Sequence, residues 1–277
     1  MNDAQRSAIA EFRRLHESGC FVLPNPWDVG TALYLQHLGF KALATTSSGF
    51  AFSRGLPDEV RAIPLDAMLG HLREIVAATP LPVNADFQSG YADEPEGVAA
   101  NVQLCAMTGV AGLSIEDARE DGASLYEDRL AVERVKAARA AIDASGIPVV
   151  LTARCEAWLV GHPDAQRLAR ERLAAYAEAG ADCLYAPGIQ DLREIEAIVR
   201  LVAPKPVNVL VSAPGELTVP RLADLGVRRV SVGSALARAA WGAFLRAARG
   251  ILETGSFDGF ADAAPYGELN GFFRGRG

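Results

Sequence analysis

Side chains suited to metal or proton chemistry stand at the ends of three predicted strands. Asp86 lies in PVNADFQSGY, Glu116 in GLSIEDA and Arg154 in VVLTAR. Gln88 follows Asp86 by two residues, so both side chains fall on the same side of an extended strand. Mg²⁺ takes one or two protein carboxylates and fills its other positions with waters and substrate oxygens. We therefore expect Asp86, Gln88 and Glu116 to hold Mg²⁺ or Mn²⁺, with a structural ion pair to Arg154 as the alternative.

No amine or imidazole base stands at these strand ends. The three lysines precede predicted strands or lie within a helix, and three of the four histidines lie on predicted helices. These residues are Lys41, Lys136, Lys205, His16, His37 and His71. His162 lies in the loop after the fifth strand, where we expect it to be solvated. The pattern excludes a Schiff-base mechanism and indicates a metal held by carboxylates near an anionic substrate.

A segment of small residues, TTSSGFAFSRGLPDE, follows the second predicted strand. Its Ser47, Ser48 and Gly49 could present N–H groups and hydroxyls to a carboxylate or an enolate oxygen. An ordinary flexible loop is the alternative. Asp58 follows a proline in the same segment and is by position a turn or helix-capping residue.

Short β-rich apolar runs alternate along the chain with longer helical patterns, which is typical of a parallel sheet with crossover helices. The predicted strands are 20–25, 41–47, 81–87, 111–117, 148–154, 181–187, 206–211 and 228–233. The predicted helices include 3–18, 65–78, 96–108, 128–144, 165–179, 191–202 and 218–225. Eight such units in 277 residues predict a closed (β/α)8 TIM barrel, with an open doubly wound sheet as the alternative.

The chain exceeds what eight units need at both ends. We expect one domain, residues 1–277, made of an N-terminal helix (1–19), a barrel (20–234) and a C-terminal helical extension (235–277). The extension opens with the apolar helix SALARAAWGAFLRAARGIL, whose apolar face is wide enough to pack on a neighbouring subunit.

Composition limits the partners. The net charge of −7 argues against nucleic acid and against an anionic membrane, because both need clustered Lys and Arg. The four cysteines follow no metal or redox spacing and are expected to be reduced core thiols. No signal peptide and no apolar run of membrane-spanning length is visible, so a cytoplasmic location is expected.

Together these segments resemble the isocitrate lyase/phosphoenolpyruvate mutase superfamily. The resemblance runs from residue 21 to about 240 in the family's order and spacing. Its segments are NPWDVGTALYLQHLGFKALATTSSGFA, LPDE, PVNADFQSGY, GVAGLSIEDA, VVLTAR, AYAEAGADCLYAPG, PVNVLV and LADLGVRRVSVG.

The resemblance implies a Mg²⁺-dependent enzyme that makes or breaks a C–C or P–C bond beside an α-oxo carboxylate. Asp86 and Glu116 would hold the metal, and Asp58 would line the site near it as a catalytic group. The pyruvoyl end would bind at Ser47, Ser48 and Gly49. Arg154 and Asn208 would contact the carboxylate or the departing group. A homo-oligomer, a tetramer or dimer with C-terminal helices swapped between subunits, is also implied.

Two departures from the family narrow the activity. Where isocitrate and 2-methylisocitrate lyases have a loop with Cys-Gly-His, this chain reads DAREDGASLYEDRL, and the second metal-side acid is Gln88. A His-x-Ser/Lys feature of phosphonate-forming members is replaced by YAPGIQ. The favoured reading is a lyase, a decarboxylase or hydrolase of a small oxo-diacid such as oxaloacetate.

Three alternatives stay open. One is phosphoenolpyruvate mutase-type P–C chemistry, and another is a catalytically retired carboxylate-binding barrel, which Gln88 favours. The third is a phosphosugar-binding isomerase, suggested by the helix that opens at Gly233 and Ser234.

Overall fold

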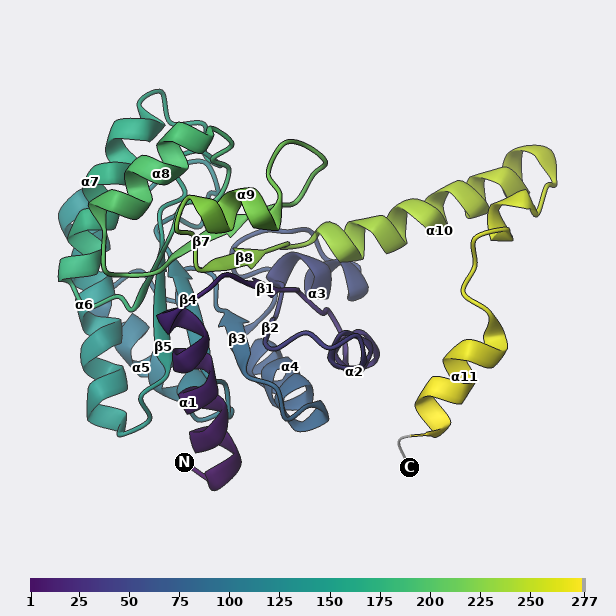
Figure 1. Cartoon of the computed structure of the whole chain (residues 1–277), viewed down its shortest axis with the longest axis horizontal. Coiled ribbons are helices and arrows are strands. Elements are labelled where there is room, and N and C mark those ends of the chain that lie inside the picture. Colours follow the sequence, from purple (N-terminus) through teal and green to yellow (C-terminus); the bar gives the residue numbers. More distant parts are fainter. Residues whose placement is uncertain (276–277) are drawn as a thin grey trace. The chain divides into compact units, whose positions relative to one another are not determined.

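Eight short parallel strands form the centre of the molecule, as the computed structural model shows for residues 1–275 (Figure 1). The strands are β1 (Phe21–Leu23), β2 (Leu43–Ala44), β3 (Val83–Asp86), β4 (Gly112–Glu116), β5 (Val150–Arg154), β6 (Cys183–Tyr185), β7 (Val207–Leu210) and β8 (Arg229–Ser231). They pair in the order β1-β8-β7-β6-β5-β4-β3-β2, and the Ala44 N–H donates to the Pro24 carbonyl where the two ends meet. The predicted (β/α)8 barrel is confirmed.

Helices follow the strands and surround them in Figure 1. They are α1 (Asp3–Glu17), α2 (Val29–His37), α3 (Ser47–Ser53), α4 (Leu65–Ala78), α5 (Pro95–Ala106), α6 (Asp128–Ser145), α7 (Ala165–Glu178), α8 (Leu192–Leu201) and α9 (Val219–Asp224). The helices expected from the apolar periodicity are all present, with ends shifted by up to two residues. Several predicted helices are followed in the sequence by a glycine, where a helix cap belongs. These glycines, Gly39, Gly109, Gly146, Gly180 and Gly226, all have positive φ angles, and Gly146, at +67°, is the left-handed cap of α6.

The strands are shorter than predicted, which changes the place of one candidate residue. β3 ends at Asp86, and Gln88 lies in the following turn with a φ of +46°. The expectation that Asp86 and Gln88 point the same way on one strand is therefore wrong. In the sequence, apolar and polar residues keep alternating beyond Asp86, so this pattern does not show where β3 ends. The strand ends there because the backbone turns at Gln88.

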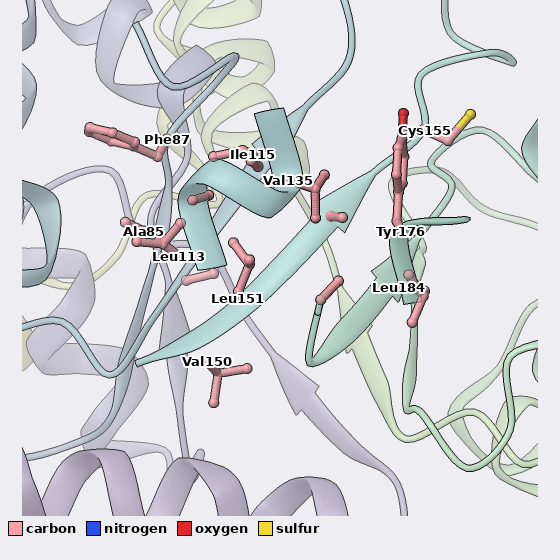
Figure 2. Packing of buried hydrophobic residues seen from close by; sticks show 14 of the residues in the cluster. Ala85, Phe87, Leu113, Ile115, Val135, Val150, Leu151, Cys155, Tyr176 and Leu184 are labelled. Carbon is pink, nitrogen blue, oxygen red and sulfur yellow. The ribbon is translucent and has the colours of Figure 1, made fainter. Parts of the chain in front are cut away.

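Side chains along each strand point alternately into the barrel lumen and outward to the helices. Arg229 on β8 donates to the Thr152 hydroxyl on β5 at 2.9 Å, a bond that crosses the barrel and so marks the lumen side. Apolar residues between these polar positions point to the helices. Figure 2 shows Leu113 and Leu151 packed with Val135 of α6, and both leucines have no exposed surface. Truncating either leucine to alanine is expected to cost about 2–5 kcal/mol.

The N-terminal helix α1 covers the end of the barrel where strands begin. Arg13 donates to the Pro148 carbonyl just before β5, at 2.9 Å. His16 Nε2 lies 3.3 Å from Arg229 Nη1, and burial together with this guanidinium lowers the pKa of His16 to about 3. Helix α1 thus closes this end of the barrel, so we look for the active site at the opposite end, where the strands finish.

The chain divides into two compact units, Met1–Ala235 and Leu236 onward. The second unit consists of most of α10 (Ala235–Thr254), a short 3-10 helix (Asp258–Phe260) and α11 (Tyr266–Arg274). Large apolar side chains of this unit are exposed, among them Phe244, Leu252 and Tyr266. The division falls where the barrel and the extension were expected to meet. A single domain, and a swap between subunits, stay predictions.

Among the described residues, none of the helices combines the length and the apolar character needed to cross a membrane.

Candidate active site

The side chains at the ends of three neighbouring strands meet, two carboxyl groups against one guanidinium. Asp86, Glu116 and Arg154 are the last residues of β3, β4 and β5. Arg154 Nη1 lies 2.8 Å from Asp86 Oδ1 and 3.1 Å from Glu116 Oε2. All three side chains are at most 18% exposed. The sequence-predicted carboxylates and arginine thus form one cluster at the mouth of the barrel.

Glu156 joins the cluster, although the sequence did not single it out. Arg154 Nε donates to Glu156 Oε1 at 2.9 Å, and the Glu156 side chain is 6% exposed. Its backbone N–H donates to Asp117 Oδ1, while Asp117 Oδ2 accepts from Arg172 and from the Tyr176 hydroxyl. The signal that could have found Glu156 is its place two residues after Arg154. Asp117, by contrast, holds the β5 end and the helix α7 in place.

Within the small-residue segment, Ser47–Ser53 form the helix α3 and not a flexible loop, while the residues that follow have no regular structure. Thr46 is its N-cap residue, and its hydroxyl accepts from the Gly49 N–H at 3.2 Å. The Ser47 N–H and hydroxyl both donate to Asp86 Oδ2, at 2.9 and 2.8 Å. Thus the start of α3 is tied directly to the carboxylate cluster.

Asp58 also faces the start of α3. The Ser48 hydroxyl donates to Asp58 Oδ2 at 2.5 Å. Partial burial raises the pKa of Asp58; the hydrogen bond from Ser48 lowers it, and the neighbouring Asp86 raises it further. The residue as a whole is exposed to solvent.

Two predicted site residues have their amide groups engaged elsewhere. The Gln88 amide bonds the backbone of Glu59 and Arg61. Asn208 is 2% exposed; its Oδ1 accepts from Arg229 Nε and its Nδ2 donates to Ser231, each at 2.9 Å. The roles of Gln88 as a metal ligand and of Asn208 as a substrate contact remain predictions.

Negative charge exceeds positive charge in the cluster. Burial raises the pKa of Glu116 to about 8; Arg154 opposes this rise, and the carboxyls of Glu156, Asp86 and Asp58 add to it. Burial likewise raises the pKa of Glu156. Burial disfavours the charge on Arg154, but its carboxylate neighbours outweigh this and raise its pKa. Three carboxyl groups thus contact one guanidinium, and that of Asp58 adds a fourth nearby.

This donor set fits a small, hard dication. It offers only oxygen atoms, and a second positive charge would favour the ionised form of Glu116, whose pKa burial and the neighbouring carboxyls raise. No group of three or more His, Cys, Asp or Glu arranged around a metal position occurs within residues 1–275. Mg²⁺ does not need one, because one or two protein carboxylates with waters suffice. Asp86 and Glu116 are the residues that would hold it.

Tyr91 is a second group that the sequence did not single out. Its hydroxyl is buried and has no hydrogen-bond partner within the described chain. Burial and the nearby Asp86 carboxylate raise its pKa. It lies in the same PVNADFQSGY motif as Asp86, which was the available signal.

The lysines and histidines lie away from this cluster, as expected. Lys205 donates to the Ala181 carbonyl and Lys136 pairs with Glu133 on its own helix. His71 is buried against Phe50, and burial lowers its pKa to about 4. His162 is partly exposed and accepts from the Asp164 N–H at 3.1 Å.

The helix start at Gly233 has its N–H groups occupied. The N–H groups of Val232 and Gly233 donate to Asn25 Oδ1 at 3.0 and 2.9 Å. A phosphate gripped at this turn would have to displace that amide, so the geometry speaks against the phosphosugar isomerase.

Comparison with known proteins decides the family. The family model described as phosphoenolpyruvate phosphomutase matches residues 12–252. The chain belongs to the phosphoenolpyruvate mutase/isocitrate lyase superfamily. A solved structure of this superfamily type, a Burkholderia cenocepacia J2315 protein assigned as a lyase/mutase, is 49% identical with a TM-score of 0.93, and the match covers 98% of both chains.

Curated relatives agree with this membership. An uncharacterized protein of Mycobacterium tuberculosis is 36% identical over 93% of this chain and 94% of its own length. A 2-methylisocitrate lyase of Salmonella typhimurium is 35% identical over 68% of this chain and 63% of its own length. An oxaloacetate decarboxylase of Pseudomonas aeruginosa is 30% identical over 82% of this chain and 79% of its own length. This superfamily member is accordingly an enzyme of the carbon–carbon lyase type.

Proposed function

We propose that this superfamily member is a Mg²⁺-dependent lyase that cleaves a C–C bond of a small α-oxo or 2-hydroxy carboxylate, with an oxaloacetate-type diacid as the best substrate. The observation that carries the proposal is the cluster in which Asp86, Glu116 and Glu156 lie within 3.1 Å of the Arg154 guanidinium. Asp58 is near enough to raise the pKa of Glu116, and the cluster holds no amine or imidazole. Similarity to an oxaloacetate decarboxylase supports the choice of substrate.

The protein's own groups would bind and orient the diacid. The start of α3 presents the Ser48 hydroxyl next to Asp58, and Arg154 supplies the one guanidinium of the cluster. We assign the substrate carboxylate to Arg154 and the pyruvoyl end to the Ser47–Gly49 turn, with Asn208 on β7 as a further contact. A bound dication would supply Lewis-acid stabilisation of enolate charge.

Proton transfer is assigned to Asp58. Loss of CO₂ from an oxaloacetate-type diacid leaves the electron pair of the broken bond as a pyruvate enolate, whose carbon then takes one proton. A carboxyl whose pKa is raised is suited to hold and deliver that proton, and Asp58 is open to the substrate. Arg154 holds Asp86 and Glu116 in place during the step.

Turnover of oxaloacetate tests the proposal. We expect the purified enzyme to form pyruvate faster than Mg²⁺ alone does, and Asp86→Asn and Glu116→Gln to lower the rate by at least about a hundredfold. Glu194→Gln is the matched control, because Glu194 is a 4% exposed carboxylate paired with Arg170 outside the cluster. No pyruvate above the metal-alone rate would refute the decarboxylase, and a rate loss equal to the control's would refute the site.

The same assay separates the remaining alternatives. A retired binding protein takes up Mg²⁺ and oxalate but converts nothing, whereas a phosphonate-forming enzyme converts phosphoenolpyruvate. A cytoplasmic homo-oligomer, dimer or tetramer, is part of the proposal, and analytical ultracentrifugation of the full chain tests the assembly.

A further inference from the structure

Gln88 lies where the superfamily's second metal-side acid would stand, but its side chain has another use. It is 5% exposed, in the turn after β3. Its Oε1 accepts from the Arg61 N–H at 3.1 Å, and its Nε2 donates to the Glu59 carbonyl at 3.4 Å. The amide therefore acts once as acceptor and once as donor on two backbone groups of one segment.

The segment that Gln88 bonds has no regular structure of its own. Residues 54–64, between α3 and α4, contain neither helix nor strand, and Arg61 has a φ of +65°. In a helix or a strand, ladder bonds would satisfy these backbone groups. Here the side chain of Gln88 takes over that task for Glu59 and Arg61.

Two residues of this segment, Asp58 and Arg61, contact other parts of the barrel mouth. Asp58, just before the clamped residues, accepts from Ser48. The Arg61 guanidinium lies 2.6 Å from Asp93 Oδ1 and 3.2 Å from Glu120 Oε2. Glu120 belongs to residues 117–128, the stretch that replaces the family's Cys-Gly-His loop. The Tyr126 hydroxyl of that stretch donates to the same Asp93 oxygen at 2.7 Å.

We propose that Gln88 is a positioning residue, whose amide clamps the backbone of Glu59 and Arg61 and thereby sets Asp58 against Ser48 and Arg61 against Asp93 and Glu120. Glutamine suits this role because it both donates and accepts. A carboxylate could only accept, and it would face the Glu59 carbonyl. Where family members have an acid, this chain thus has an amide that holds the segment carrying Asp58.

Three variants of the full chain test the clamp. Gln88→Met keeps the shape without polar atoms, and Gln88→Glu keeps only the acceptors. Gln5→Met is the matched control: Gln5 is 6% exposed and donates to two backbone carbonyls, of Ala106 and Val110, far along the chain from the clamp. We expect exchange of the Arg61 amide hydrogen to speed up at least about tenfold in Gln88→Met and not in the control, because the opened segment exposes its N–H groups. Gln88→Glu loses the bond to Glu59 but can still accept from the Arg61 N–H, so it should speed this exchange less.

Metal binding and kinetics complete the test. Titration with Mg²⁺ alone should give Gln88→Met a Kd within about twofold of the parent value. The kinetic consequence rests on the proposed function: kcat for oxaloacetate should fall about tenfold or more through a misplaced Asp58, with KM changed much less.

Opposite results would overturn the proposal. Unchanged Arg61 exchange, with Mg²⁺ affinity about tenfold weaker in Gln88→Met or tenfold tighter in Gln88→Glu, would make Gln88 a metal ligand instead. Failure of the parent enzyme to turn over oxaloacetate would refute the proposed function only, since exchange and Mg²⁺ titration need no substrate and still decide the role of Gln88.

Discussion

The Arg154 guanidinium on β5 reaches past β4 to the Asp86 carboxylate on β3, with 2.8 Å between Nη1 and Oδ1. The bond is possible because both side chains lie on the lumen side of the barrel at the ends of their strands. Asp86 also accepts two bonds from Ser47 on its other oxygen. The carboxylate is thereby held from two sides before any substrate binds, which is the preorganisation that charge-stabilising sites need.

Removing the guanidinium should destabilise the protein strongly. In Arg154→Met, the buried carboxylates of Asp86, Glu116 and Glu156 lose their shared cation, so we expect the free energy of unfolding at pH 8 to fall by about 3–5 kcal/mol. Urea unfolding followed by circular dichroism measures this loss. Arg167→Met is the control, because Arg167 forms exposed pairs with Asp164 and Glu171, and its loss should be far smaller. Equal losses would show that the cluster is not a buried charge network.

Stability without Mg²⁺ should fall as the pH rises from about 5 to 8. The folded pKa of Glu116, about 8, lies above its ordinary value of 4.5. Between these values the folded state keeps a proton that the unfolded state has lost, so the stabilisation present at low pH disappears as pH rises through the folded pKa. Unfolding free energies across this range measure the slope, and Glu116→Gln should flatten it.

Mg²⁺ should oppose that loss of stability. A dication favours the ionised form of Glu116, so binding should release a proton and the Mg²⁺ affinity should rise between pH 6 and about 8. Calorimetric titration in two buffers of different ionisation heat detects the proton. A Kd independent of pH over this range would contradict the assignment of Glu116 to the metal.

Ser48→Ala should move the alkaline limb of the pH–rate profile, where the rate falls as the pH rises, to higher pH. The Ser48 hydroxyl donates to Asp58 and lowers its pKa. Without that bond, the pKa of Asp58 rises, so its protonated form persists to higher pH. The rate of pyruvate formation between pH 4 and 8 measures the shift. Ser53→Ala, which removes a hydroxyl that donates to the Phe50 carbonyl of the same helix, should leave the limb in place.

Asp117 should matter for stability more than for metal binding. Its carboxylate pairs with Arg172 and accepts from Tyr176, and both Asp117 and Arg172 side chains are at most 6% exposed. Asp117→Asn should lower the free energy of unfolding by about 3 kcal/mol, and Tyr176→Phe by about 1 kcal/mol. Chemical unfolding checks both values, and Mg²⁺ titration should show little change in Tyr176→Phe. A large loss of Mg²⁺ affinity there would place Asp117 in the metal site.

The sequence alone predicted the barrel and the meeting of three of its charged side chains at one mouth. Alternating β-rich and helical segments, with glycine stops such as Gly146, identify eight βα units, because burial patterns and backbone caps are local properties. Asp86, Glu116 and Arg154 could be placed at one mouth of the barrel for a related reason. The ends of parallel strands in a closed barrel meet at one rim, whatever the helices between them do.

Only the tertiary structure decided how these side chains pair and what their neighbours do. Gln88 leaves the strand at a backbone turn with positive φ, and Asn208 bonds Arg229 on the neighbouring strand β8. Glu156 enters the site because Asp117 fixes its backbone N–H. Such contacts join residues far apart along the chain. Their geometry depends on strand register, on where each strand stops and on the competition among buried polar groups for partners, none of which the spacing of residue types contains.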